Sequence, residues 1–292
     1  MSSTIRHTIH SVLFATDLSV DSHVALAYAI DIAAACKAKL FIVHVLDPGA
    51  ANAIDSTSSD LRKLAETAKN DLKQISESLL AAQGINGDVL VRYGSVRDLI
   101  FQAQQEFSAD MVVLGSSGRK TGHGKGLGSS AEAILRSIPC VALTIGPGVV
   151  RPGAVQRPMP PGIQTVLFPT DFSATSLAAL PTVISAVTSL PAHMLLLHVC
   201  QLYGSPSCLG HEAVCQEKLD KIAEFVEKQS VPVERLIRQG DIIENILSLA
   251  NEKEVSFIAM GVHRGDLEDG TRLHGIVSEI IREARCPVLT KA

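Results

Sequence analysis

The nine residues at Ser11–Ser19 read SVLFATDLS, and they return almost unchanged at Thr165–Ser173 as TVLFPTDFS. In both places a short apolar run ends in Thr-Asp, as a buried strand would, and a Ser suited to start a helix follows. Asp17 and Asp171 are 154 positions apart (171 − 17). A chain that repeats a strand-to-helix junction in this way is expected to contain two copies of one folding unit.

Further blocks repeat in the same order, and they are FIVHVL (41–46) with LLLHVC (195–200), VRYGSVRDLI (91–100) with IRQGDIIENI (237–246), and ADMVVLG (109–115) with VSFIAMG (255–261). Their offset falls only from 154 (195 − 41) to 146 (255 − 109), which indicates a duplication. We therefore predict two domains, 1–147 and 162–292, joined by a linker at 148–161 that is rich in Pro and Gly.

Within each copy, short runs rich in Val, Ile and Leu alternate with longer helical stretches. In the first copy the predicted strands are 10–16, 40–46, 88–92, 110–115 and 141–145. The predicted helices are 22–36, 60–83, 96–107 and 129–137. This alternation predicts an α/β fold in which a doubly wound parallel sheet carries helices on both faces. Such sheets bind ligands beyond the carboxyl ends of their strands, where the strand order reverses.

Composition and charge exclude several classes of function. The 292 residues are 46% hydrophobic, which is too apolar for intrinsic disorder. A net charge of −4 and only 4% aromatic residues argue against a general nucleic-acid binder. Apolar runs such as 194–200 are far shorter than the roughly 20 residues of a membrane span, and no export signal is visible. We expect a cytoplasmic protein that binds neither nucleic acid nor membrane, with reduced cysteines.

The sequence after the fourth predicted strand is rich in glycine. Residues 115–134 read GSSGRKTGHGKGLGSSAEAI and lead into a predicted helix. Glycine lets backbone N–H groups approach an anion, and a helix N-terminus adds a partial positive charge. The hydroxyls of Ser129 and Ser130 stand at that N-terminus. The pattern favours phosphate binding, although a plain surface loop is also often rich in glycine.

Two familiar phosphate motifs do not fit this loop. A Walker A loop requires Gly-Lys-Ser/Thr, whereas Gly124-Lys125 is followed by Gly126. Residues 126–131 match GxGxxA, but they follow the fourth strand, and no acidic residue ends a next strand about 20 residues later.

A third spacing fits better. The loop resembles the nucleotide loop of the universal stress protein family, in which two residues separate the first two glycines and nine more precede a Gly-Ser pair. Here these positions are Gly115, Gly118 and Gly128-Ser129. The companion segments agree, and they are LFATD (13–17), HV (44–45), YGSVRDLI (93–100) and IPCVALTI (138–145). The resemblance extends over nearly the whole chain, once per half. It implies two tandem domains, each with a parallel sheet of order 3-2-1-4-5 that is Rossmann-like and of the adenine nucleotide alpha hydrolase-like type.

The resemblance also implies a ligand in the first half, namely ATP with Mg²⁺. The implied binding residues are Ala15, Thr16, Asp17, Val45, Leu114, Gly115, Gly118, Gly128, Ser129 and Ser130. Asp17 would meet adenine or ribose, Val45 would contact the base, and the glycine and serine residues would hold the phosphates. From its position alone, Asp17 could instead cap the following helix.

The second copy departs from this pattern. Arg264 stands where the second glycine belongs, and Ile276 replaces the hydroxyl of Ser129. Three carboxylates fall within 266–269, where they would repel an anion. We expect this half to bind ATP weakly or not at all.

Three functions remain open on the sequence. The leading one is a stress-response module in which bound ATP sets conformation or partner choice. The first alternative is a slow ATPase or autophosphorylating protein that uses Ser129 or Ser130 as acceptor, although no nucleophile–base motif is present. The second is a nucleotide-free scaffold for a partner protein. The fifth strands, 141–145 and 288–290, are expected to pair within one chain or between two chains.

Cysteine and histidine form one further pattern in the second copy. Four such residues fall close together, and they are Cys200, Cys208, His211 and Cys215. The last three are spaced i, i+3, i+7 on a predicted helix, so they could seat zinc or a redox centre, although a small apolar helix face is the simpler explanation. His44 and His198 hold matched positions in apolar strands, which predicts buried histidines with a shared role in the fold.

Overall fold

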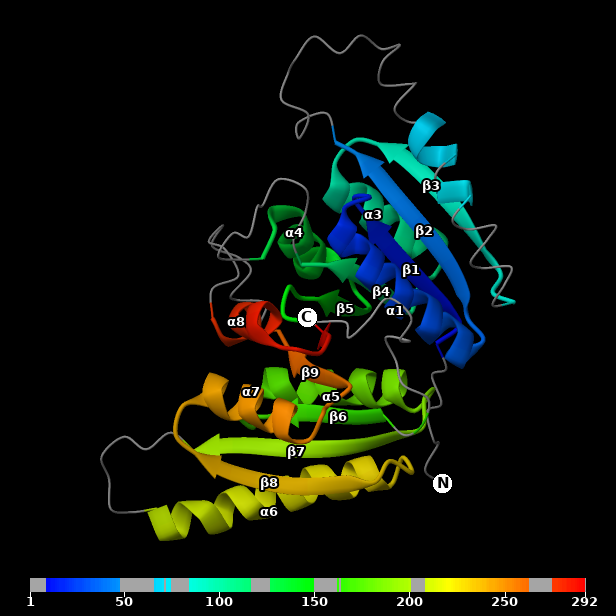
Figure 1. Cartoon of the computed structure of the whole chain (residues 1–292). Coiled ribbons are helices and arrows are strands. Elements are labelled where there is room, and N and C mark those ends of the chain that lie inside the picture. Colours follow the sequence, from blue (N-terminus) through cyan, green and yellow to red (C-terminus); the bar gives the residue numbers. More distant parts are fainter. Residues whose placement is uncertain are drawn as a thin grey trace. The chain divides into compact units, whose positions relative to one another are not determined.

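The protein is described by a computed structural model, shown in Figure 1. The structure describes residues 9–47, 66–70, 72–74, 84–116, 127–149, 162, 164–200, 208–262 and 275–291. The chain forms two compact units, built chiefly from Ile9–Leu143 and from Pro160–Ala292. Each unit contains one copy of the sequence repeat. The domain bounds 1–147 and 162–292 stay predictions.

The first unit alternates strands and helices. Its strands are β1 (Ser11–Thr16), β2 (Lys39–Leu46), β3 (Gly87–Tyr93), β4 (Met111–Gly115) and β5 (Val141–Ile145). Its helices are α1 (Val20–Cys36), α3 (Val96–Glu106) and α4 (Ser129–Ser137), with further helical residues at 66–70 and 72–74. The strands lie in the order β3-β2-β1-β4-β5, and β1 pairs in parallel with β2 and with β4. This confirms the predicted doubly wound sheet.

The second unit repeats this plan. Its strands are β6 (Gln164–Pro169), β7 (Ala192–Cys200), β8 (Val233–Gln239), β9 (Phe257–Gly261) and β10 (Val288–Lys291). Its helices are α5 (Ala174–Val187), α6 (Cys208–Glu227), α7 (Ile242–Glu252) and α8 (Ile276–Glu283). The order β8-β7-β6-β9-β10 is again 3-2-1-4-5, and helices cover both faces of this sheet (Figure 1).

The central strands are apolar along their length because helices cover both faces of each sheet. Residues 12–14 of β1 and 166–168 of β6 are at most 1% exposed. This explains why the sequence shows continuous apolar runs instead of alternation. Among the described residues, no helix is both long and apolar enough to cross a membrane.

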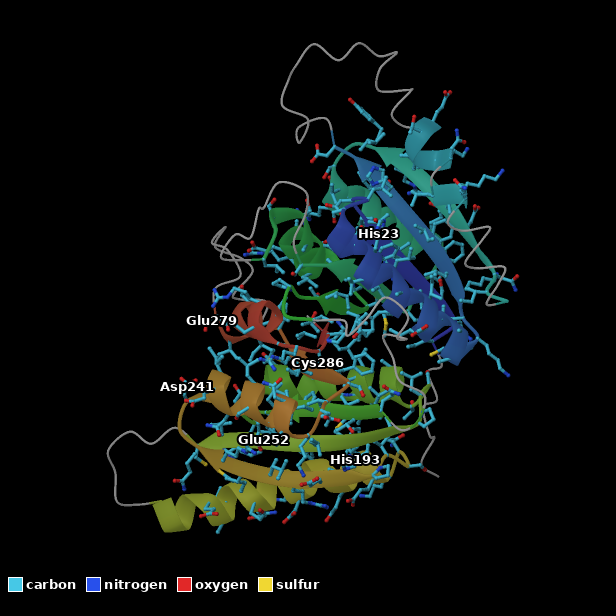
Figure 2. All side chains as sticks on the ribbon, in the orientation of Figure 1. His23, His193, Asp241, Glu252, Glu279 and Cys286 are labelled. Carbon is cyan, nitrogen blue, oxygen red and sulfur yellow. The ribbon has the colours of Figure 1, made fainter. Side chains whose placement is uncertain are left out.

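The helices begin in two different ways. The side chains of Ser19 and Ser173 each accept a hydrogen bond from an N–H three residues on, at 3.2 Å, and so cap α1 and α5. Asp241, labelled in Figure 2, caps α7 in the same way at 2.8 Å. By contrast, α4 and α8 begin at Gly128 and Gly275, which have no side chain to cap with. The N-termini of α4 and α8 thus lack the side-chain acceptor that caps α1, α5 and α7.

Candidate functional site

The carboxyl ends of β1 and β4 meet at the point where the strand order of the first unit reverses. Ala15 in β1 lies opposite Val43 of β2 on one side and opposite Leu114 of β4 on the other. The chain leaves β1 toward β2 and leaves β4 toward β5, so the two connections depart in opposite directions. This switch point is the place where ligands of doubly wound sheets bind.

The turn after β1 is held by its own side chains. Thr16 Oγ1 accepts from the N–H of Leu18 at 3.0 Å and donates to Ser22 Oγ at 3.0 Å. Asp17 Oδ1 accepts from the N–H of Ser19 at 3.0 Å. These bonds enclose Leu18 in the left-handed region, at φ 61°, which a leucine rarely adopts. The helix cap is Ser19, whereas Asp17 stabilises the turn that precedes it.

The turn after β6 reproduces these bonds in the second unit. Thr170 Oγ1 accepts from the N–H of Phe172 at 3.0 Å and from Ser176 Oγ at 2.9 Å. Asp171 Oδ1 accepts from the N–H of Ser173 at 2.9 Å, and Phe172 has φ 64°. Since this half lacks the glycine spacing and yet keeps the turn, the carboxylate bond serves the fold in both halves.

A histidine on the neighbouring strand ties each turn to the sheet. Nδ1 of His44 lies 2.8 Å from the carbonyl oxygen of Thr16, and Nδ1 of His198 lies 2.8 Å from that of Thr170. A carbonyl oxygen can only accept, so Nδ1 carries a proton and donates it in this bond, which leaves Nε2 as the nitrogen that can bind elsewhere. His44 is 5% exposed. The predicted shared role of the two histidines in the fold is confirmed, whereas the predicted burial holds for His44 alone, because His198 is half-buried.

The structure brings most of the predicted nucleotide residues to this edge. Thr16 pairs in register with His44, and each is followed directly by a predicted residue, Asp17 in the turn and Val45 in β2. Leu114 is buried, and Gly115 ends β4. Gly118 and the basic residues of the glycine-rich loop lie outside the described residues.

The start of α4 is anchored to the end of β4. The N–H of Gly128 donates to the carbonyl oxygen of Ser116 at 2.7 Å. Ser129–Ser130 follow in the first turn and are exposed. The carboxylate of Glu132, also in that turn, forms an ion pair with Arg136 at 2.7 Å, which offsets its charge. The result is a helix N-terminus with two exposed hydroxyl groups, tied to the strand beside β1.

The matching helix start in the second unit differs. Gly275 has φ 128°, whereas Gly128 has φ −63°, which any residue can adopt. Among the described residues, the bond that ties α4 to β4 has no counterpart between Gly275 and Val262. Ile276 places hydrocarbon, 37% exposed, where the first unit has a hydroxyl. Residues 264–269, with the arginine and the three predicted carboxylates, lie outside the described part.

Comparison with a family model identifies the family to which this chain belongs. The model of the Universal stress protein family matches two regions of the chain, residues 8–145 and 162–290. The chain belongs to the universal stress protein family. The two matched regions confirm that the family's domain occurs twice in tandem.

Related universal stress proteins cover one half of the chain or both. A protein of Staphylococcus saprophyticus that is named for this family is 26% identical over 169 residues, which are 57% of this chain and 98% of the relative. Universal stress protein G of Salmonella typhimurium is 27% identical over 110 residues, which are 36% of this chain and 76% of that protein. The crystal structure of a universal stress protein from Archaeoglobus fulgidus has a TM-score of 0.70 at 19% identity, covering 96% of this chain and 95% of that one. This last likeness shows the fold.

Four cysteines of this universal stress protein fall into two groups. Burial raises the pKa of the Cys36 thiol to about 11 and that of Cys286, labelled in Figure 2, to about 12. Cys200 and Cys215 instead lie close to His198, a grouping that the helical spacing of the cysteines did not include. The side chains of the other two predicted ligands, Cys208 and His211, lie outside the described residues.

Proposed function

We propose that the first half of this universal stress protein binds ATP, with Mg²⁺ on the phosphates, as a regulatory ligand in the cytoplasm. The observation that carries the proposal is the start of α4. Its exposed serines Ser129–Ser130 stand at a glycine-capped N-terminus that Gly128 ties to the end of β4, at the switch point of the sheet. Backbone N–H groups and hydroxyl groups at a helix N-terminus are well suited to hold phosphate oxygens.

The neighbouring strands suit the nucleoside end of the ligand. Val45 offers a half-buried apolar surface to a base, and Asp17 is a half-buried carboxylate that can accept from a ribose hydroxyl. Ala15 and Leu114 lie opposite each other on β1 and β4 and would form the base of the site. Apolar contact at one end and hydrogen-bond donors at the other match the chemistry of a nucleoside triphosphate.

Magnesium would be held through phosphate oxygens and water, as is usual for this ion. A regulatory role of this kind needs no catalytic step, because ATP occupancy alone would alter the surface that the first half offers to a partner. Pairing through the fifth strands stays a prediction of the sequence.

The test is the double substitution Ser129→Ala with Ser130→Ala in the full chain. Loss of two hydroxyl donors to charged phosphates, each worth about 1.5–3 kcal/mol, is expected to weaken ATP binding by about 100-fold or more in calorimetric titration with Mg²⁺. Ser95→Ala is the matched control, because Ser95 also begins a helix of this unit, is exposed and makes no cap bond there.

ATP binding that is unchanged in the double variant would remove α4 from the site. An ADP-release assay on the same samples separates the alternatives. Steady ADP release would favour the slow ATPase, and no nucleotide binding by the unsubstituted chain would favour the scaffold.

A further inference from the structure

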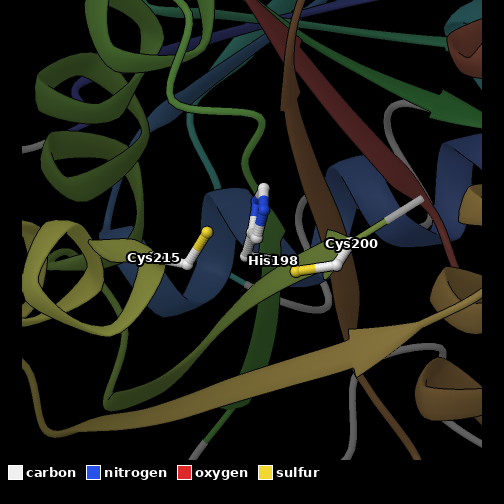
Figure 3. Close-up of side chains that lie close together, drawn as sticks. All are labelled: His198, Cys200 and Cys215. Carbon is white, nitrogen blue, oxygen red and sulfur yellow. The ribbon is translucent and has the colours of Figure 1, made fainter. Parts of the chain in front are cut away.

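Three side chains that commonly bind metals converge at the carboxyl edge of the second unit. A ring nitrogen of His198 and the Sγ atoms of Cys200 and Cys215 all lie within 4.8 Å of one another. Figure 3 shows both sulfur atoms turned toward the imidazole ring. His198 and Cys200 come from the end of β7, and Cys215 comes from α6. Both cysteines are thiols, and Cys215 is only 2% exposed.

The histidine is already oriented as a metal ligand. Its Nδ1–H donates to the carbonyl oxygen of Thr170 at 2.8 Å, so the nitrogen left with a lone pair is Nε2. A backbone carbonyl that fixes the ring through its other nitrogen is the usual support of a metal-binding histidine. The Phe172 ring packs on the imidazole, with 4.3 Å between ring centres, and Lys218 Nζ lies 5.1 Å from the centre of that phenyl ring. Aromatic packing limits solvent access to one side of the cluster.

The first unit provides an internal comparison. His44 makes the same bond to its turn that His198 makes, so the fold by itself accounts for a histidine at this position. At the offset of 154, however, Leu46 stands in the place of Cys200 (200 − 154), and Leu18 in that of Phe172 (172 − 154). The thiol and the aromatic ring beside the histidine are therefore particular to the second unit.

We propose that the second unit binds one Zn²⁺ ion through Nε2 of His198 and the thiolates of Cys200 and Cys215. Imidazole with two thiolates is a ligand set that suits zinc. Tetrahedral coordination with Zn–S bonds of about 2.3 Å places two sulfur atoms about 3.8 Å apart, so side-chain rotation would close the cluster around the ion. Each thiol gives up its proton on binding, so two protons are released per ion, and the neutral imidazole releases none.

The fourth ligand is a water molecule or a further side chain of α6. In the sequence, Cys208 and His211 stand seven and four positions before Cys215, which is the spacing of one helix face. Zinc held in this way would link β7 to α6 and so stabilise the second unit, independently of any nucleotide in the first.

The test uses the full chain, stripped of metal with a chelator and kept reduced. Zinc is then titrated in competition with a chromophoric chelator, and protons are counted in weak buffer. One ion and two protons per chain are expected from a three-residue site. Cys200→Ser and Cys215→Ser should each weaken zinc binding by about 100-fold or more, because even groups that only orient a ligand contribute about 10–100-fold. Cys36→Ser and Cys286→Ser are the matched controls and should leave it unchanged.

A Co²⁺ titration of the unsubstituted chain keeps the test independent of whether the variants fold. Thiolate-to-cobalt charge-transfer bands with tetrahedral ligand-field bands are expected, and zinc should abolish them. Three results would overturn the proposal: uptake well below one zinc per chain, an equal loss in the control variants, or a Cys200–Cys215 disulfide that forms in air with no metal uptake in the reduced chain. Loss of affinity in Cys208→Ser or His211→Ala would identify the fourth ligand within the same proposal.

Discussion

Individual residues can be compared with their counterparts because the chain contains each turn twice. Asp17 and Asp171 accept the same bond, from Ser19 and Ser173, at 3.0 and 2.9 Å. The turn bond is therefore the same in both halves, although Asp17 is half-buried and Asp171 is exposed. A difference in ligand binding between variants of the two carboxylates then reports on something other than this bond.

Asp17→Ala and Asp171→Ala form a matched pair. Each is expected to lower the free energy of unfolding by about 1 kcal/mol through loss of the turn bond, measured by urea unfolding. Only Asp17→Ala should weaken ATP binding, by about tenfold or more, because a carboxylate bond to a ribose hydroxyl is worth about 1.5–3 kcal/mol. Equal ATP affinity in the two variants would confine Asp17 to the turn.

The proposed zinc ligands show which contacts a sequence pattern can predict and which it cannot. His198 and Cys200 are two positions apart in a strand, so their side chains share one face, and this signal was present in the sequence. Helical spacing singled out Cys215 on α6. Cys215 meets His198 and Cys200 because α6 packs on the face of the sheet that carries these two side chains. The sequence did not predict which face α6 covers, because seven residues separate α6 from β7 and packing decides the face.

At the level of elements, the sequence predicted most bounds closely. Helix α4 begins and ends at the predicted residues 129 and 137, and β5 at 141 and 145. Helix α1 starts at Val20, two residues before the prediction, because Ser19 is the cap and Asp17 closes the turn ahead of it. Apolar runs were sufficient for the strands since both faces of each sheet are covered. The predicted helix 60–83 can be checked only at 66–70 and 72–74, which are helical.

The glycine that ends β9 has a packing role. A Cβ on Gly261 would lie 2.8 Å from the carbonyl oxygen of Thr175 and 3.2 Å from the Cα of Ser176, both in α5. Helix and strand therefore touch through backbone at this point. Gly115 holds the matching position at the end of β4, next to α1, and is implied by the family resemblance to face the nucleotide.

Gly261→Ala is expected to lower the free energy of unfolding by about 1–3 kcal/mol, because backbone of α5 must move to admit the methyl group. Gly115→Ala should do the same if β4 approaches α1 as closely as β9 approaches α5. Urea unfolding of both variants measures the loss of stability, and ATP titration measures any loss of nucleotide binding. A Gly115→Ala variant of unchanged stability that no longer binds ATP would assign this glycine to the ligand alone.

Across the whole molecule, the two halves share a fold and differ in chemistry. The first has hydroxyl groups at the start of α4, whereas the second has Ile276 there and Gly275 in a conformation with φ 128°. The sequence predicted this asymmetry from the loss of the glycine spacing. It did not reveal the cluster around His198, which stands at the same edge of the second sheet.

We expect one ATP per chain. Two or three missing donors to phosphate would weaken binding in the second half by several powers of ten. Calorimetric titration of the intact chain should give a molar ratio close to one, and the Ser129→Ala/Ser130→Ala variant should lose that site without exposing another. A ratio near two, or a second site that survives in the variant, would contradict the asymmetry.

The left-handed residue in each turn also records history. Leu18 and Phe172 share a φ within a few degrees, at 61° and 64°, although their side chains differ and neither favours it. A strained backbone retained through a change of side chain is inherited, so the single-domain ancestor already had this turn and the histidine behind it. The glycine spacing of the family occurs in the first half only and the paired cysteines in the second half only, so these are the features by which the two copies differ. The two copies thus share the scaffold of the turn, and the chemistry that distinguishes them is carried by residues around it.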